Sequence, residues 1–120
     1  MYKDFTEMPV WQQANSLVQN IYIITVNLPK SEDYALTSQL RRAALSVTGN
    51  IAEGFGRGHT KDKANFYLYA RGSAFEVKSY LFTGVTVNYF DQKDVDNIIA
   101  NINLIIESLN KLIKTLRSQP

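Results

Sequence analysis

The chain has 120 residues, of which 45% are hydrophobic and 20% are charged, with a formal net charge of +2. This length suits a single domain with one core over residues 1–120, and the composition excludes a disordered chain. There are no cysteines, so disulfides and thiolate metal sites are excluded.

The amino terminus has no basic segment followed by an apolar run. No later apolar stretch approaches the ~18 residues that are needed to span a bilayer. The absence of cysteine is also typical of a reducing compartment. We therefore expect a cytoplasmic protein without membrane contact.

The first half of the chain predicts two amphipathic helices. From Val10 onward, apolar residues recur at alternating steps of four and three, which predicts a helix over about residues 9–27. Pro29 ends it. Ser31 is a candidate cap for a second helix with two acidic residues in its first turn, where carboxylates suit the helix dipole. This helix is expected to run to about residue 55.

A third helix is predicted after the glycine-rich segment GFGRGH, with Thr60 as its candidate cap. Its β-branched and aromatic tail, VTVNYF, resembles a strand, but the apolar stripe runs through it and predicts a helix. The predicted core stripe consists of Phe66, Ala70, Ser73, Val77, Tyr80, Gly84 and Val87.

The fourth predicted helix has Asp91 as its cap and an unusually broad apolar face. The stripe is Val95, Ile98, Ile102, Ile105, Leu109, Leu112 and Leu116, widened by Ile99, Ile106 and Ile113. A face this broad must be buried in the chain's own core or against another subunit. Four amphipathic helices with short turns predict an all-α fold, an antiparallel up-down-up-down four-helix bundle.

A polar stripe borders the apolar face of the second helix. On a helical wheel of about 100° per residue, this polar stripe covers an arc about 80° wide. Its members are Gln39, Arg42, Ser46, Asn50 and Glu53, and the third helix offers Arg71, Ser73 and Glu76 as a complement. Partly buried polar groups need partners, so we expect a structural hydrogen-bond network. Both a Glu53–Arg71 and an Arg42–Glu76 pairing fit the spacing.

Three glycines, Gly54, Gly56 and Gly58, follow this stripe. Glycines that cradle a nucleotide follow a strand and open a helix, whereas these close one helix and precede another. We expect a left-handed turn that ends the second helix, and no cofactor.

An enzymatic role would use Glu53 as a general base near His59, the only histidine. Such catalysis needs a second titrating group or an oriented nucleophile, and no such constellation is present. The Glu-x-x-His pairs of di-iron bundles are also missing. We therefore expect neither an enzyme nor a metal site.

Basic residues form two clusters, and lysine and arginine bind phosphates without reading bases. The candidate nucleic-acid contacts are Arg57, Lys61 and Lys63 around the glycine-rich turn, and Lys111, Lys114 and Arg117 near the carboxyl end. Solvated helix faces are the alternative. Aromatic rings near the turn could stack on unpaired bases, with core packing as the alternative. These rings belong to Phe55, Phe66, Tyr67 and Tyr69.

Four segments carry a family resemblance: WQQA at 11–14, QLRRA at 39–43, NIAEG at 50–54 and ARGS at 70–73. In this order they resemble the bacterial four-helix-bundle proteins encoded in intervening sequences of 23S rRNA genes, over nearly the whole chain. The resemblance implies kinship with the accessory variability proteins of diversity-generating retroelements, which are pentameric basic barrels that bind nucleic acid and a reverse transcriptase.

Two functions follow from this resemblance and from the residues. The first is a non-enzymatic accessory protein, a homo-pentamer by resemblance, with RNA, DNA or another protein as its partner. The second is a purely structural oligomer in which the polar network sets the subunit register. Residue content alone does not separate the two.

Overall fold

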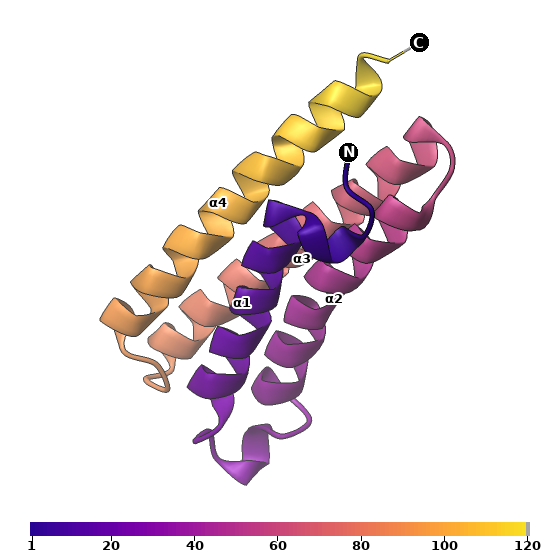
Figure 1. Cartoon of the computed structure of the whole chain (residues 1–120). Helices are drawn as coiled ribbons and strands as arrows, with labels where there is room; N and C mark the ends of the chain where they lie inside the picture. Colours follow the sequence, from indigo (N-terminus) through magenta and orange to yellow (C-terminus); the bar gives the residue numbers. More distant parts are fainter. Residues whose placement is uncertain (120) are drawn as a thin grey trace.

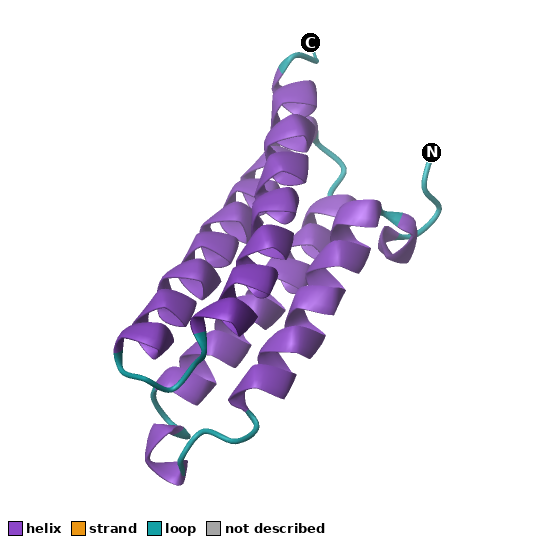
Figure 2. Ribbon diagram, turned by 90° about the vertical axis from the view of Figure 1, so that its left-hand side faces the viewer, coloured by secondary structure: helices purple, strands orange, loops and turns teal. Residues whose placement is uncertain are grey.

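The structure is a computed structural model that describes residues 1–119. Within this range the chain forms helices and no strand (Figure 2). The elements are η1 (Phe5–Glu7), α1 (Pro9–Thr25), η2 (Lys30–Glu32), α2 (Leu36–Gly56), α3 (Thr60–Thr86) and α4 (Gln92–Arg117), where η denotes a short 3₁₀ turn. The predicted all-α class is confirmed.

The four α-helices form an up-down-up-down bundle (Figure 1). Each packs against its neighbours along the chain, and α4 closes the bundle by packing against α1. The bundle is elongated, with extents of 49 × 23 × 20 Å. Both termini and the α2–α3 turn lie at one end, and the other two connections lie at the opposite end. This arrangement follows from four amphipathic stripes and short connections.

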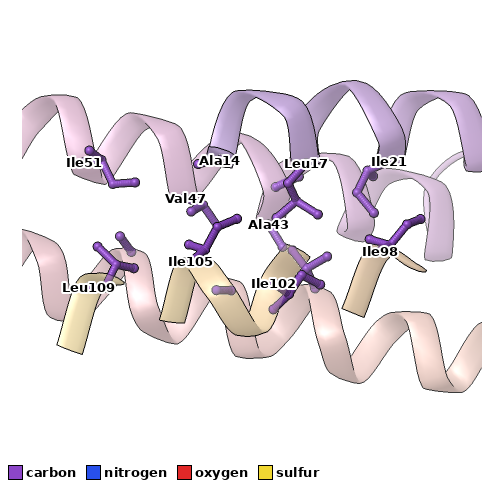
Figure 3. Packing of buried hydrophobic residues seen from close by; sticks show 14 of the residues in the cluster. Ala14, Leu17, Ile21, Ala43, Val47, Ile51, Ile98, Ile102, Ile105 and Leu109 are labelled. Carbon is purple, nitrogen blue, oxygen red and sulfur yellow. The ribbon is translucent and has the colours of Figure 1, made fainter. Parts of the chain in front are cut away.

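The core runs along the bundle axis and takes one apolar stripe from each helix. Figure 3 shows side chains of α1 and α2 facing those of α4. Those labelled there are Ala14, Leu17, Ile21, Ala43, Val47, Ile51, Ile98, Ile102, Ile105 and Leu109, all buried. The widening residues Ile99 and Ile106 pack against this core, and Ile113 is buried in it. The broad face of α4 is therefore used within the chain.

The start of α2 differs from the prediction. After Pro29 the chain forms η2, which contains Ser31, and α2 begins only at Leu36. The backbone N–H of Leu36 donates to Oε1 of Glu32 at 3.2 Å. A carboxylate outside the helix thus satisfies one of the N–H groups that a helix start leaves unpaired. Ser31 is not the cap.

The core stripe of α3 also differs from the prediction. The buried residues are Ala64, Tyr67, Ala70, Ser73, Ala74, Val77, Leu81 and Gly84. Phe66 and Tyr80 are only partly buried, and Val87 is exposed. Four members of the predicted stripe are therefore buried as expected, namely Ala70, Ser73, Val77 and Gly84. The prediction was wrong for Phe66, Tyr80 and Val87, because α3 carries apolar side chains on more than one face and the periodicity fits several stripes.

The helix α3 ends at Thr86, inside the segment that the stripe predicted to stay helical. Asn88 follows with φ = 67°, the only positive φ within residues 1–119. The N–H of Tyr89 donates to the carbonyl oxygen of Gly84 at 2.8 Å, which closes the turn. The ring of Phe90 folds back over Gly84, where a Cβ atom would overlap it. The prediction of continuous helix therefore failed in its last residues.

The starts of α3 and α4 are close to the predictions. Asp91 occupies the N-cap position of α4, although its side chain makes no capping hydrogen bond. The N-cap position of α3 is His59, so Thr60 is the first helical residue instead of the cap.

Candidate nucleic-acid interface

The α2–α3 turn contains no left-handed glycine. Gly54 and Gly56 lie inside α2, and the chain leaves the helix at Arg57 with φ = −82° and ψ = 148°. Gly54 is instead a point of close approach between helices, because a Cβ atom there would lie 2.7 Å from Cε1 of Tyr67. The predicted left-handed turn was wrong.

Lys63 caps the carboxyl end of α2. Its Nζ donates to the backbone oxygen of Phe55 at 2.7 Å and to that of Gly54 at 3.2 Å. It also lies 5.6 Å from the centroid of the Phe55 ring. A cation at this position satisfies unpaired carbonyls and the negative end of the helix dipole. The charge of Lys63 is therefore directed at the chain itself.

Arg57 is likewise engaged within the chain. Its Nη2 lies 3.2 Å from Oε2 of Glu53, and its guanidinium carbon lies 4.6 Å from the centroid of the Phe66 ring. The Arg57 and Glu53 side chains are 46% and 54% exposed, so this is a surface ion pair.

The two basic clusters meet at one end of the bundle. Lys61, in the first turn of α3, and Arg117, the last residue of α4, line one hollow of ≈ 330 Å³ together with Asn65 and Gln119. We call it the end hollow. Lys114 lies one turn before Arg117 on α4.

The predicted cations of α3 and α4 at this end of the bundle differ in their partners. Lys61, Lys114 and Arg117 are exposed and make no ion pair with the residues that the structure describes. Lys111 pairs with Glu107, with Nζ and Oε1 3.3 Å apart. Of the six predicted contacts, Lys61, Lys114 and Arg117 thus combine exposure with an unused charge.

The aromatic residues near the turn also divide into two groups. Tyr67 is buried, which raises the pKa of its hydroxyl, and Phe55 is partly buried against the core. The face of Phe66 is covered by Arg57. Tyr69 is 58% exposed and meets Phe66 edge to face, with the ring centroids 5.7 Å apart. Tyr69 is thus the ring most accessible to a base.

The polar network between α2 and α3 is smaller than predicted. The hydroxyl of Ser73 donates to Oγ of Ser46 at 2.8 Å. The amide of Asn50 donates to Oγ of Ser46 at 3.0 Å and to its backbone oxygen at 2.8 Å. These three residues join the two helices at the border of the core.

The other predicted members of the network lie outside it. Arg71 reaches across to α4, where its Nη1 donates to Oδ1 of Asn110 at 2.9 Å. Glu76 accepts a hydrogen bond of 3.3 Å from the hydroxyl of Tyr80. Gln39 and Arg42 are exposed. Neither the Glu53–Arg71 nor the Arg42–Glu76 pairing forms, because each charged group has a nearer partner or faces solvent.

Sequence reasoning missed a polar contact that joins α1 to α2. Nε of Arg41 donates to Oγ1 of Thr25 at 3.0 Å, and the guanidinium lies 4.6 Å from the centroid of the Tyr22 ring. Thr25 is 2% exposed. A threonine four residues after Ile21, in the core stripe of α1, was the signal, because a buried hydroxyl needs a partner.

A metal site and a membrane-spanning helix are both absent from residues 1–119. No three His, Cys, Asp or Glu side chains gather there in a way that would hold a metal ion. No described helix combines the length and the apolar character that crossing a bilayer requires.

These observations define a small all-α protein, a four-helix bundle with cations at one end that have no ion-pair partner among residues 1–119. The family model of the 23S rRNA-intervening sequence protein matches residues 6–111, and the chain belongs to this family. The resemblance inferred from the sequence segments is confirmed.

A solved structure has the same fold. It is the crystal structure of a protein of unknown function from the S23 ribosomal protein family of Bacteroides thetaiotaomicron. The TM-score is 0.79 at 21% identity, over 88% of this chain and 98% of that chain. No curated protein matches the chain.

Proposed function

We propose that this chain is a non-enzymatic, homo-oligomeric protein of the cytoplasm that binds nucleic acid at the end hollow. The observation that supports this is the meeting of Lys61, from the middle of the sequence, and Arg117, from near its carboxyl end, in one hollow. With Lys114 they leave three cationic side chains without an ion-pair partner in residues 1–119. Such groups bind phosphates with little sequence preference.

The description of the family supports RNA as the first nucleic acid to test, because it names an intervening sequence of 23S rRNA. The resemblance to accessory variability proteins implies a ring of five copies. Any closed assembly would repeat the end hollow and let several copies contact one nucleic acid. Glu53, the candidate general base, is instead paired with Arg57, which supports a non-enzymatic role.

The test is electrophoretic binding to unrelated single- and double-stranded RNA and DNA at about 50 and 200 mM salt. The variant carries Lys61→Ser, Lys114→Ser and Arg117→Ser. We expect this triple variant to bind all sequences more weakly than the parent. Its affinity should also depend less on salt, because binding releases about three fewer counterions. Arg57 and Lys63 are left intact because they make contacts within the chain.

The matched control removes the same charge elsewhere, by Lys30→Ser, Arg42→Ser and Lys93→Ser, all at exposed positions. It should bind like the parent. Equal loss in both variants would show that only the total charge matters and would contradict the end hollow. A parent chain that binds no nucleic acid at the lower salt would favour the purely structural oligomer.

A further inference from the structure

A second hollow lies at the end of the bundle that holds both termini, between the amino-terminal segment and the last turns of α4. Its volume is ≈ 250 Å³, and we call it the amino-terminal hollow. Its apolar lining includes Met8 and Val10, which are buried, and Leu112 of α4, which is partly buried. Tyr2 adds an aromatic ring that is 46% exposed. An accessible ring thus borders an apolar hollow.

The polar groups of the amino-terminal hollow are few. Ser108, Lys111 and Thr115 supply them, all from α4. Ligand sites typically combine a mostly apolar lining with a small number of polar groups that fix the orientation of the ligand. The hollow is smaller than the about 300–1,000 Å³ that sites for drug-sized molecules occupy. Its size therefore suits one flat ring system.

Three exposed cations of α4 connect the amino-terminal hollow with the end hollow. Lys111 lines the first hollow, Arg117 lines the second, and Lys114 lies midway between them along the helix. Each step of three residues turns the side chain by about 60° around the helix axis. The three cations therefore follow the outer side of α4 from one hollow to the other. Along the axis they span about 9 Å, which is the rise of two or three stacked nucleotides.

Two carboxylates that are next to hollow residues in the sequence are already engaged. Oε1 of Glu7 accepts a hydrogen bond of 2.7 Å from the backbone N–H of Lys3. Glu107 pairs with Lys111, and neither carboxylate residue lines the hollow. The Glu107–Lys111 pair is exposed, and surface ion pairs are weak. A phosphate can therefore compete with Glu107 for Lys111.

We propose that the amino-terminal hollow takes one unpaired base of a single-stranded nucleic acid whose phosphates contact Lys111, Lys114 and Arg117. The base stacks on the ring of Tyr2, because aromatic rings bind bases of any identity by stacking. This inference rests on the proposed function and deepens it, since it assigns a preference for single strands.

The row of cations decides which ligand the hollow fits. An aromatic side chain of a protein partner would also suit an apolar lining. A regular row of positive charges that leads into the hollow instead complements the regular negative charges of a phosphate backbone. In a duplex the bases are paired and stacked on one another, so only its phosphates are available to this surface.

Binding of two single strands that differ only in their bases tests the inference. The first is a labelled DNA strand of mixed sequence with about 12 nucleotides. The second has the same length and the same phosphates but carries no bases. Fluorescence anisotropy at about 50 mM salt measures both affinities. We expect the parent chain to bind the strand with bases at least about fivefold more tightly, because stacking of one base contributes this factor or more.

Tyr2→Ala should remove this preference. It deletes the ring at the hollow and leaves every cation in place, so the affinity for the strand without bases should stay that of the parent. Tyr69→Ala is the matched control, because it removes an exposed tyrosine ring of α3 that does not line the hollow. This control should keep the preference. A strand that carries 2-aminopurine should also be quenched by the parent and less by Tyr2→Ala, because stacking on a ring quenches this fluorescent base.

Equal binding of the two strands by the parent would overturn the role of the amino-terminal hollow, while phosphate binding at the end hollow would stand. A preference that survives in Tyr2→Ala, or that is lost in Tyr69→Ala, would overturn the role of Tyr2 and of the hollow as well. A parent chain that binds neither strand would overturn both this inference and the proposed function. The two proposals therefore fail with different results.

Discussion

At the scale of single residues, Lys61 and Lys63 are two positions apart in the first turn of α3, yet their surroundings differ. Nζ of Lys63 bonds two carbonyls at the end of α2, whereas Lys61 lines the end hollow. The sequence cannot separate them, because their difference depends on where α2 ends in space. The sequence therefore predicted the basic cluster, but not which of its side chains bond within the chain and which are exposed at the end hollow.

This difference predicts different stabilities for two similar variants. Lys63→Met should lower the free energy of unfolding by about 1 kcal/mol, since it removes a charged donor from the end of α2. Lys61→Met should change it by less than about 0.5 kcal/mol, as is usual at exposed positions. Urea unfolding followed by circular dichroism measures both. Equal effects of the two substitutions would contradict the capping role.

Tyr67 predicts a loss of stability at alkaline pH. Burial raises the pKa of its hydroxyl above the ordinary value of 10.0 in the folded chain. The unfolded chain therefore loses this proton first, and stability falls as the pH rises from about 10 through the raised pKa.

Tyr67→Phe should reduce this alkaline loss without removing the ring that packs over Gly54. Denaturation midpoints at about pH 8 and 11 measure the difference. Tyr69→Phe is the control, because that ring is mostly exposed. An alkaline loss that is the same in Tyr67→Phe and the parent would contradict the assignment.

At the scale of the elements, the number and order of the helices followed from apolar periodicity, because each helix buries at least one stripe in the core. α3 was predicted less well. It carries a buried stripe through Tyr67 and an exposed one through Phe75, and periodicity alone cannot rank two stripes. Its end depends on Asn88 and on the packing of Phe90 over Gly84, both of which are tertiary features.

This turn gives a prediction for the α3–α4 connection. Gly84→Ala should destabilise the fold by about 1–3 kcal/mol, because the new methyl group overlaps the ring of Phe90. Gly49→Ala should stabilise it by about 0.5–1 kcal/mol, since that site is open and alanine favours the helix. Thermal unfolding of the two variants should therefore shift in opposite directions. A stabilised Gly84→Ala chain would show that Phe90 moves aside freely.

At the scale of the whole molecule, the candidate site depends on topology. Lys61 and Arg117 are far apart in the sequence, and they meet only because the start of α3 and the end of α4 lie at the same end of the bundle. Once an up-down-up-down order of the four helices is assumed, that order predicts that the start of α3 and the end of α4 lie close together. The hydrogen bonds of Lys63 and the pairing of Glu53 with Arg57 need side-chain geometry that no helical wheel supplies.

The position of the termini affects how the protein can be labelled. Both termini lie at the end that holds Lys61 and Arg117 (Figure 1). An affinity tag or fluorescent reporter fused to either terminus would lie beside these cations. A polyhistidine tail there would mimic nucleic-acid binding by the chain, and a bulky reporter would block that binding. A reporter inserted after Tyr34, which is 98% exposed in the α1–α2 connection, would sit at the far end of the 49 Å bundle.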